Sequence, residues 1–277
     1  MGERCRNVGD WDSNLTGSKL ECFDFDYKNL TRDYISSFST IVLLAGHSSV
    51  PMCANDESGA WKNNVENFKG LLDKLRPDQQ FIYASSGSVY GQGLQTHEDA
   101  ALPLPMNMYD LTKQTIDKLA LISGKRTYGL RFGTVCGFSP NPRNELLINS
   151  MVCDAHSQGR VFVSNHSSLR AVLGMSDLCR AICSIVNQPE AAPGVYNLSS
   201  FSHDIGDISL RVASKTGAEV VPLPPSRTYS FSFQAWKFQD TFKWKPQETV
   251  ESIVDELMEH PLYLDKSYNR STNLVTY

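Results

Sequence analysis

The chain has 277 residues, and 41% of them are hydrophobic, enough for one large domain or a domain with a smaller lobe. Its 26 basic and 30 acidic residues give a formal net charge of −4 and form no basic stripe, which argues against nucleic-acid binding. No apolar run approaches a membrane span, and the first residues lack the apolar segment of a secretion signal. We therefore expect a cytoplasmic protein that binds neither membrane nor nucleic acid.

The cysteines support the same view. There are seven, an odd number, and none forms a Cys-x-x-Cys pair, which fits a reduced protein better than a disulfide-bonded one. Cys179 and Cys183 lie four residues apart on an expected helix and indicate a buried apolar face. No His or carboxylate completes a zinc-like ligand set, so no metal site is expected.

The first half of the chain alternates between short apolar runs and helical patterns. Strands are expected over residues 20–25, 40–46, 80–84 and 127–132, and helices over 31–37, 57–75 and 108–123. Residues 40–46 are apolar on both faces, which favours a place in the middle of a parallel sheet. The helix over 57–75 carries an apolar stripe formed by Trp61, Val65, Phe68, Leu71, Leu72 and Leu75. The alternation predicts an α/β fold with a doubly wound parallel sheet.

Beyond Gly137 the pattern is less regular. Helices are expected over 145–157, 176–185, 205–214 and 249–259, and strands over 160–163, 171–173 and 194–198. Ser176 has the character of an N-cap for its helix. We expect residues 139–277 to form mainly a small lobe over the carboxyl ends of the strands, where open α/β sheets bind ligands, with 171–198 returning to the core.

The strongest functional signal lies between residues 81 and 113. A buried strand runs into a Ser/Gly turn, and Tyr109 and Lys113 then follow at i and i+4 on a helix, so their side chains share one face. A neighbouring ammonium favours the phenolate form of a tyrosine and lowers its pKa. Such a pair, next to a hydroxyl-rich strand end, can transfer a proton to or from an alcohol or ketone.

The run Ala84-Ser85-Ser86-Gly87-Ser88-Val89-Tyr90-Gly91, followed by Tyr109-x-x-x-Lys113, resembles the extended short-chain dehydrogenase/reductases, which include NAD-dependent nucleotide-sugar epimerases and dehydratases. Further matches lie at residues 43–46, 63–65 and 130–137. The resemblance implies a Rossmann-like, dinucleotide-binding part over residues 1–138. It also implies that the lobe over 139–277 binds substrate.

The resemblance also implies roles for individual residues. Tyr109 would be the acid/base, Lys113 would lower its pKa, and Ser86 would fix the reacting oxygen, with Ser85 as the neighbouring alternative. The implied cofactor contacts are Ala45, Gly46, Asn64, Ala84, Tyr109, Lys113 and Phe132. The implied substrate contacts are Ser86, Ser88, Thr134, Arg170 and Arg227, with Arg143 a further weak candidate.

Residue chemistry supports the arginine assignments and argues against one reaction of the family. Arg suits a nucleotide-sugar phosphate because its guanidinium donates bidentate hydrogen bonds. For Arg170 the structural alternative is a salt bridge to Asp177. Gly87 and Ser88 stand where family dehydratases carry an Asp-Glu pair, so a 4,6-dehydration is not expected.

One part of the resemblance is missing. The Gly-x-x-Gly-x-x-Gly turn that normally opens a dinucleotide site is absent, and too few residues precede Gly46 to hold it. Asp10 or Asp12 could correspond to the acidic residue that grips the adenosine ribose. We expect the first strand–helix unit of the family to be absent, which would weaken cofactor binding and expose a sheet edge.

The sequence therefore predicts an NAD- or NADP-dependent epimerisation or oxidoreduction of a nucleotide sugar by hydride transfer. The alternative is a non-catalytic or degenerate member of the fold that binds a ligand or partner. A reductase of a non-sugar ketone is a third possibility. The helices over 57–75 and 108–123 resemble the pair that forms the family's dimer interface, so a homodimer is expected.

Overall fold

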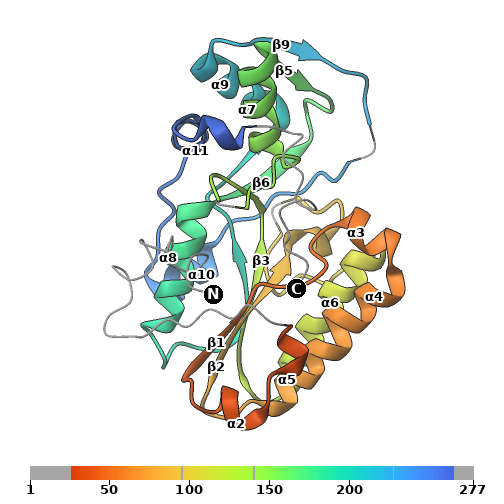
Figure 1. The fold of residues 1–277 in the computed structure, drawn as a ribbon, viewed down its shortest axis with the longest axis vertical. Helices are drawn as coiled ribbons and strands as arrows, with labels where there is room; N and C mark the ends of the chain where they lie inside the picture. Colours follow the sequence, from red (N-terminus) through yellow and green to blue (C-terminus); the bar gives the residue numbers. More distant parts are fainter. Residues whose placement is uncertain (1–25, 95, 140, 227, 265–277) are drawn as a thin grey trace.

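A four-stranded parallel sheet lies at the centre of the described part of the chain (Figure 1). The structure is a computed structural model that describes residues 26–264 apart from 95, 140 and 227. The sheet order is β1-β2-β3-β7, formed by Thr40–Leu43, Gln80–Ser86, Arg126–Phe132 and Gly194–Leu198. All three pairings are parallel, and helices cover both faces, so the predicted doubly wound α/β fold is confirmed.

One face of the sheet is covered by helices from the first half of the chain. They are α2 (Arg32–Ile35), α3 (Val50–Asn55), α4 (Glu57–Trp61), α5 (Phe68–Lys74) and α6 (Met108–Ile122), with the short 3-10 turn η1 (Tyr27–Asn29) beside them. Val65, Phe68 and Leu71 are buried against the sheet. The predicted continuous helix over 57–75 is wrong in one detail, because a π-helical segment, η2 (Lys62–Asn67), separates α4 from α5.

The other face is covered by α8 (Met175–Val186) and α10 (Trp236–Phe242). The prediction that Ser176 caps α8 is wrong, because Gly174 is the N-cap and makes no side-chain cap bond. The Glu248 carboxylate instead accepts from the Asp177 amide at 2.7 Å. Helix α10, a short helix whose Phe238 and Phe242 are buried, was not predicted from the sequence.

The position of β1 also differs from the prediction. It lies at an edge of the sheet within the described residues, not in the middle. Val42 and Leu44 are exposed, at 37% and 44%, whereas Leu43 packs into the core. The apolar side chains of 40–46 thus point to both faces of the sheet. At β1, described residues cover only the face that carries Leu43. The expected strand over 20–25 lies outside the described residues.

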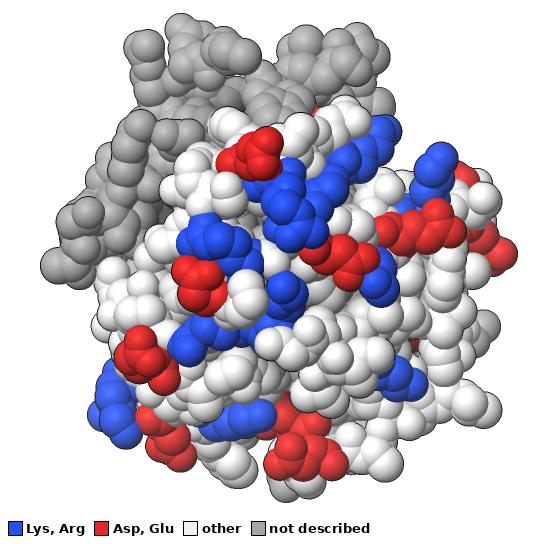
Figure 2. Space-filling view, turned by 90° about the horizontal axis from the view of Figure 1, so that it is seen from below, with Lys and Arg blue, Asp and Glu red and all other residues white. Residues whose placement is uncertain are grey.

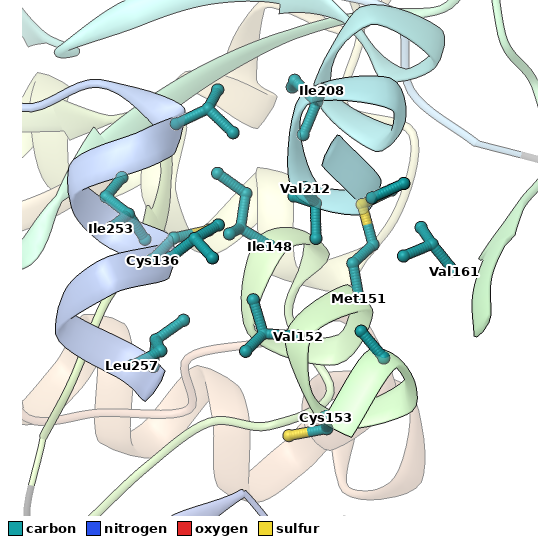
Figure 3. Packing of buried hydrophobic residues seen from close by; sticks show 14 of the residues in the cluster. Cys136, Ile148, Met151, Val152, Cys153, Val161, Ile208, Val212, Ile253 and Leu257 are labelled. Carbon is teal, nitrogen blue, oxygen red and sulfur yellow. The ribbon is translucent and has the colours of Figure 1, made fainter. Parts of the chain in front are cut away.

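The second half of the chain builds a lobe with its own core (Figure 3). Helices α7 (Leu147–Gln158), α9 (Ile205–Thr216) and α11 (Val250–Met258) pack together through Ile148, Val212 and Ile253. Beside them lie the pair β5 (Arg160–Val163) and β9 (Glu219–Pro222) and the 3-10 turn η4 (Pro261–Tyr263). A three-stranded sheet completes the lobe, in the order β4 (Thr134–Cys136), β6 (Leu169–Gly174) and β8 (Phe201–Asp204).

Two features relate to the expectation that the protein binds neither nucleic acid nor membrane: the distribution of charge on its surface and the length of its helices. Seen from the end where α2 and α5 lie, Lys and Arg gather toward the middle of the face, with Asp and Glu among them (Figure 2). None of the helices formed by the described residues is long and apolar enough to cross a membrane.

Candidate active site

The candidate site lies where β2 ends and α6 begins. Ser86 is the last residue of β2, and the 3-10 turn η3 (Gly87–Tyr90) follows at once. A side chain is excluded at Gly87, because a Cβ there would lie 2.3 Å from the Phe233 ring. Helix α6 starts at Met108 because the Asn107 side chain accepts from the Asp110 amide at 3.0 Å. This cap sets Tyr109 in the first turn, beside the end of β2.

Ser86, Tyr109 and Lys113 converge at this point, as the sequence predicted. The Tyr109 hydroxyl is hydrogen-bonded to Ser86. The Lys113 Nζ lies 5.7 Å from the centre of the Tyr109 ring and donates to the Ala84 carbonyl at 2.8 Å. The three side chains thus form one cluster on the strand end.

Burial dominates the ionisation of both catalytic candidates. It raises the pKa of Tyr109, against the lowering effect of the Arg143 charge. Burial lowers the pKa of Lys113 to about 8, against the opposing charge of Asp117. A lysine that titrates this close to neutrality can respond to a change of charge beside it.

A buried carboxylate lies behind the cluster. Asp110 is 1% exposed and accepts from Ser88 Oγ at 2.7 Å and from the Tyr229 hydroxyl at 2.9 Å. Ser86 Oγ donates to Ser88 Oγ at 3.0 Å. The prediction that Ser88 contacts substrate does not fit this arrangement, because its hydroxyl is buried and directed at Asp110.

The Ser85 alternative is also disfavoured. Its hydroxyl is buried, and it has no hydrogen-bond partner within the described residues. The remaining predicted residues of this strand group are partly exposed: Ala84 lies near the end of β2, Phe132 ends β3, and Thr134 begins β4.

The turn after β1 supplies the other predicted cofactor residues. Gly46 has a φ of +148°, and a Cβ there would lie 2.7 Å from Asn64 Oδ1, so only glycine fits. Asn64 accepts from the His47 amide at 2.8 Å and donates to the His47 carbonyl at 3.0 Å and to Thr112 at 3.2 Å. Asn64 therefore holds the turn against α6. Asn64 lies within the π-helical segment η2.

A small pocket joins these two regions. It is lined by Tyr27, Leu43, Ala45, Asn64, Phe68, Tyr83, Ala84, Lys113 and Ile116, which include four of the predicted cofactor residues. The Tyr27 hydroxyl donates to the Asn63 carbonyl, so the ring is held at the pocket wall.

The arginine predictions have different outcomes. Arg170 donates to the Tyr229 carbonyl and to Thr228, and forms no ion pair with a described residue. The alternative salt bridge to Asp177 is wrong, because Asp177 pairs with Arg180. Arg143 donates to the Ser48 carbonyl at 3.4 Å and to Glu145 at 2.8 Å. Arg227 lies outside the described residues, as do Asp10 and Asp12.

Sequence reasoning missed Asp110 and Tyr229. Asp110 follows Tyr109 directly, and a carboxylate in the first turn of a helix has an ordinary explanation in the helix dipole. Tyr229 reaches the site from 119 residues away in sequence. Only the packing of the second lobe on α6 reveals it.

Comparison with known proteins identifies the family of the chain. Residues 6–199, well over half of the chain, match the NAD dependent epimerase/dehydratase family. The chain belongs to this family. It is 26% identical over 249 residues to the GDP-6-deoxy-D-mannose reductase of Pseudomonas aeruginosa, with 79% of this chain and 78% of that protein covered. The chain spans only 57% of another relative, Protein CapI of Staphylococcus aureus, which is 24% identical.

Two solved structures show the same fold. The UDP-glucuronic acid 4-epimerase from Bacillus cereus, in complex with UDP-glucuronic acid and NAD, superimposes with a TM-score of 0.77 at 18% identity, covering 93% of this chain and 86% of that one. RMD from Pseudomonas aeruginosa, complexed with NADPH, gives a TM-score of 0.73 at 20% identity over 93% and 96%. At such identities the likeness establishes the Rossmann-like fold alone.

Proposed function

We propose that this chain is an NAD- or NADP-dependent enzyme that epimerises, oxidises or reduces a sugar carbon of a nucleotide sugar. The observation that carries the proposal is the convergence of Ser86, Tyr109 and Lys113 at the carboxyl end of β2. Open α/β sheets bind ligands at this end. The bound nicotinamide would supply hydride chemistry, and the protein would supply orientation and proton transfer.

Tyr109 is the proposed acid/base. Its hydroxyl would give a proton to a sugar carbonyl oxygen or take one from a sugar hydroxyl. The Lys113 ammonium would stabilise the phenolate by charge, at the 5.7 Å separation of Nζ from the ring. Ser86 would hold the reacting oxygen, since its hydroxyl already lies beside that of Tyr109.

The residues around the small pocket fit a dinucleotide in part. Ala45 and Ala84 leave room for a cofactor close to the backbone, and Gly46 keeps the turn open. Lys113 would bind the nicotinamide ribose, and Phe132 would border the ring. Asn64 would act indirectly by fixing the turn at His47.

The substrate would lie between residues 1–138 and the lobe over 139–277. Arg170 is the proposed phosphate ligand, because its guanidinium is partly buried and no described carboxylate neutralises it. Thr134 would contact the sugar, and Arg143 would contact the phosphates or sugar near Tyr109. Arg227 stays a candidate from the sequence alone.

We also infer a homodimer formed through α6 and the helices beside it. Leu111, Leu121 and Ile122 on α6 are 37%, 73% and 78% exposed, so this helix presents apolar side chains that a second subunit could cover. Sedimentation of the wild type and of a Leu121→Glu, Ile122→Glu variant tests this. A wild-type monomer at micromolar concentration would refute it.

The first experiment for the function is calorimetric titration of the protein with NAD, NADH and NADPH. Saturable binding that weakens in Lys113→Met but persists in Tyr109→Phe supports the proposal. A folded protein that binds none of them at millimolar concentration would refute it and favour the non-catalytic alternative. Hydride transfer is then sought with a panel of UDP- and GDP-sugars, followed by nicotinamide absorbance.

A further inference from the structure

We propose that Asp110 is a positioning residue that controls the proton state of Tyr109 through the Ser88 and Ser86 hydroxyls. The inference rests on the proposed function only in taking Tyr109 as the reacting group. It adds a residue that acts through others, without touching the substrate.

Asp110 is held by neutral donors alone. Oδ1 accepts from Ser88, while Oδ2 accepts from Asn107 Nδ2 at 3.0 Å and from the Tyr229 hydroxyl at 2.9 Å. No ion pair among the described residues includes this carboxylate, although it is 1% exposed. A buried carboxylate without a cation costs free energy, so its presence one residue from Tyr109 calls for a functional reason.

The hydroxyls between Asp110 and Tyr109 are aligned. Ser88 Oγ donates to Asp110, and Ser86 Oγ donates to Ser88. With its proton committed to Ser88, the Ser86 oxygen can only accept from Tyr109. When Asp110 is ionised, the Ser86 and Ser88 hydroxyls therefore both donate toward Asp110 and away from Tyr109. This favours the protonated phenol of Tyr109.

A neutral amide in place of Asp110 would reverse the direction of the hydrogen bonds through Ser88 and Ser86. An amide would direct its oxygen toward the two donors Asn107 and Tyr229, and its NH₂ toward Ser88. Ser88 would then donate to Ser86, and Ser86 to Tyr109, which stabilises the phenolate. The loss of the negative charge acts in the same direction, because the Asp110 charge opposes ionisation of Tyr109.

Other groups around Tyr109 act on the same equilibrium. They are Lys113 on α6, Arg143 after β4, Cys53 on α3 and Tyr229 from the second lobe. The Arg143 charge favours the phenolate, whereas Cys53 and Asp110 oppose it. The Lys113 ammonium would act in the same direction as Arg143, because an opposite charge favours the phenolate. Asp110 thus keeps Tyr109 as an acid. This suits reduction: as hydride adds to a carbonyl carbon, the oxygen takes the Tyr109 proton, and the phenolate remains beside Lys113.

The test is to measure the ionisation of Tyr109 directly. Protein labelled with ¹³Cζ-tyrosine is titrated by NMR without cofactor, and the Tyr109 signal is assigned from its loss in Tyr109→Phe. The variants are Asp110→Asn and Ser88→Ala, and circular dichroism defines the pH range in which each stays folded. Asp73→Asn, at an exposed carboxylate on α5, is the matched control.

In Asp110→Asn we expect the Tyr109 midpoint to fall by at least about one pH unit, a roughly tenfold change in the ionisation constant. Ser88→Ala should give a smaller fall, because the charge of Asp110 remains, and Asp73→Asn none. A folded Asp110→Asn whose Tyr109 midpoint is unchanged, raised or beyond the folded range overturns the proposal. Because no cofactor is present, a failed NAD titration would refute the proposed function without deciding this result.

Discussion

Helix α6 buries two carboxylates about two turns apart, and their surroundings differ: Asp117 has a cationic partner and Asp110 has none among the described residues. Asp117 pairs with the buried Arg131 at 2.9 Å and accepts from the Tyr83 hydroxyl at 3.1 Å. Asp110 has hydroxyl and amide donors but no cation. A charge that is paired fastens the helix, whereas a charge left unpaired changes the properties of its neighbours.

The Asp117 end is a structural junction. Arg131 also donates to the Tyr90 hydroxyl at 2.7 Å, and Tyr90 donates to Asn197 at 2.7 Å. This network joins α6 to β2, β3 and β7 within the buried face. Breaking it should change stability, and breaking the Asp110 end should change chemistry.

The largest effect is expected at the structural end. Asp117→Ala leaves Arg131 buried without its partner and should lower the free energy of unfolding by about 3–5 kcal/mol. Urea unfolding followed by circular dichroism measures this loss. Asp117→Leu with Arg131→Met removes both charges and should recover most of it. A loss below about 1 kcal/mol in the single variant would contradict the comparison.

At the other end, Tyr109→Phe should lower the rate of hydride transfer by about 10²–10⁴. The free energy of unfolding should change by less than about 1 kcal/mol, since one hydrogen bond to Ser86 is lost. Nicotinamide absorbance with a nucleotide sugar measures the rate. A variant that keeps more than about a tenth of the wild-type rate would exclude Tyr109 as the acid/base.

Lys113 lies between the two carboxylates in the sequence of α6. Burial lowers its pKa from 10.5 to about 8, so between these values the folded protein binds fewer protons at this site than the unfolded chain. Stability from this group should therefore rise with pH over that window, by on the order of 3 kcal/mol. Urea unfolding at several pH values, with Lys113→Met as reference, measures the rise. Parallel curves for the two proteins would show that the lysine is not perturbed.

The smallest effect is expected for the stability of Asp110→Asn, within about 1–2 kcal/mol at neutral pH. Burial raises the pKa of Asp110, so its ionisation costs folding free energy. The wild type should therefore lose stability relative to the variant as the pH rises from the ordinary carboxyl range toward neutrality. Thermal unfolding of both proteins at pH 4 and pH 7 measures this: the difference in stability between the wild type and Asp110→Asn should change in sign or size. An equal difference at both pH values would mean that Asp110 ionises normally.

Much of this molecule was determined by local sequence. The strand–helix alternation predicted the parallel sheet, because periodicity is a local property. The Tyr109-x-x-x-Lys113 spacing beside a Ser-rich strand end predicted the candidate site, because i,i+4 geometry is also local. Three features were not predictable in this way: the edge position of β1 among the described strands, the cap of α8 and the interruption at Lys62–Asn67. At α8 and in the interruption, hydrogen bonds reach partners distant in sequence: the Asp177 amide donates to Glu248, and the His47 amide donates to Asn64.

The sequence by itself determined which residues could do the chemistry: Ser86, Tyr109 and Lys113. Only the tertiary structure decided which charges surround them. Tyr229 comes from the second lobe and Ser88 turns inward, so Asp110 becomes a buried acceptor beside Tyr109. Burial and hydrogen bonding set the ionisation of a side chain, and both are properties of the assembled fold.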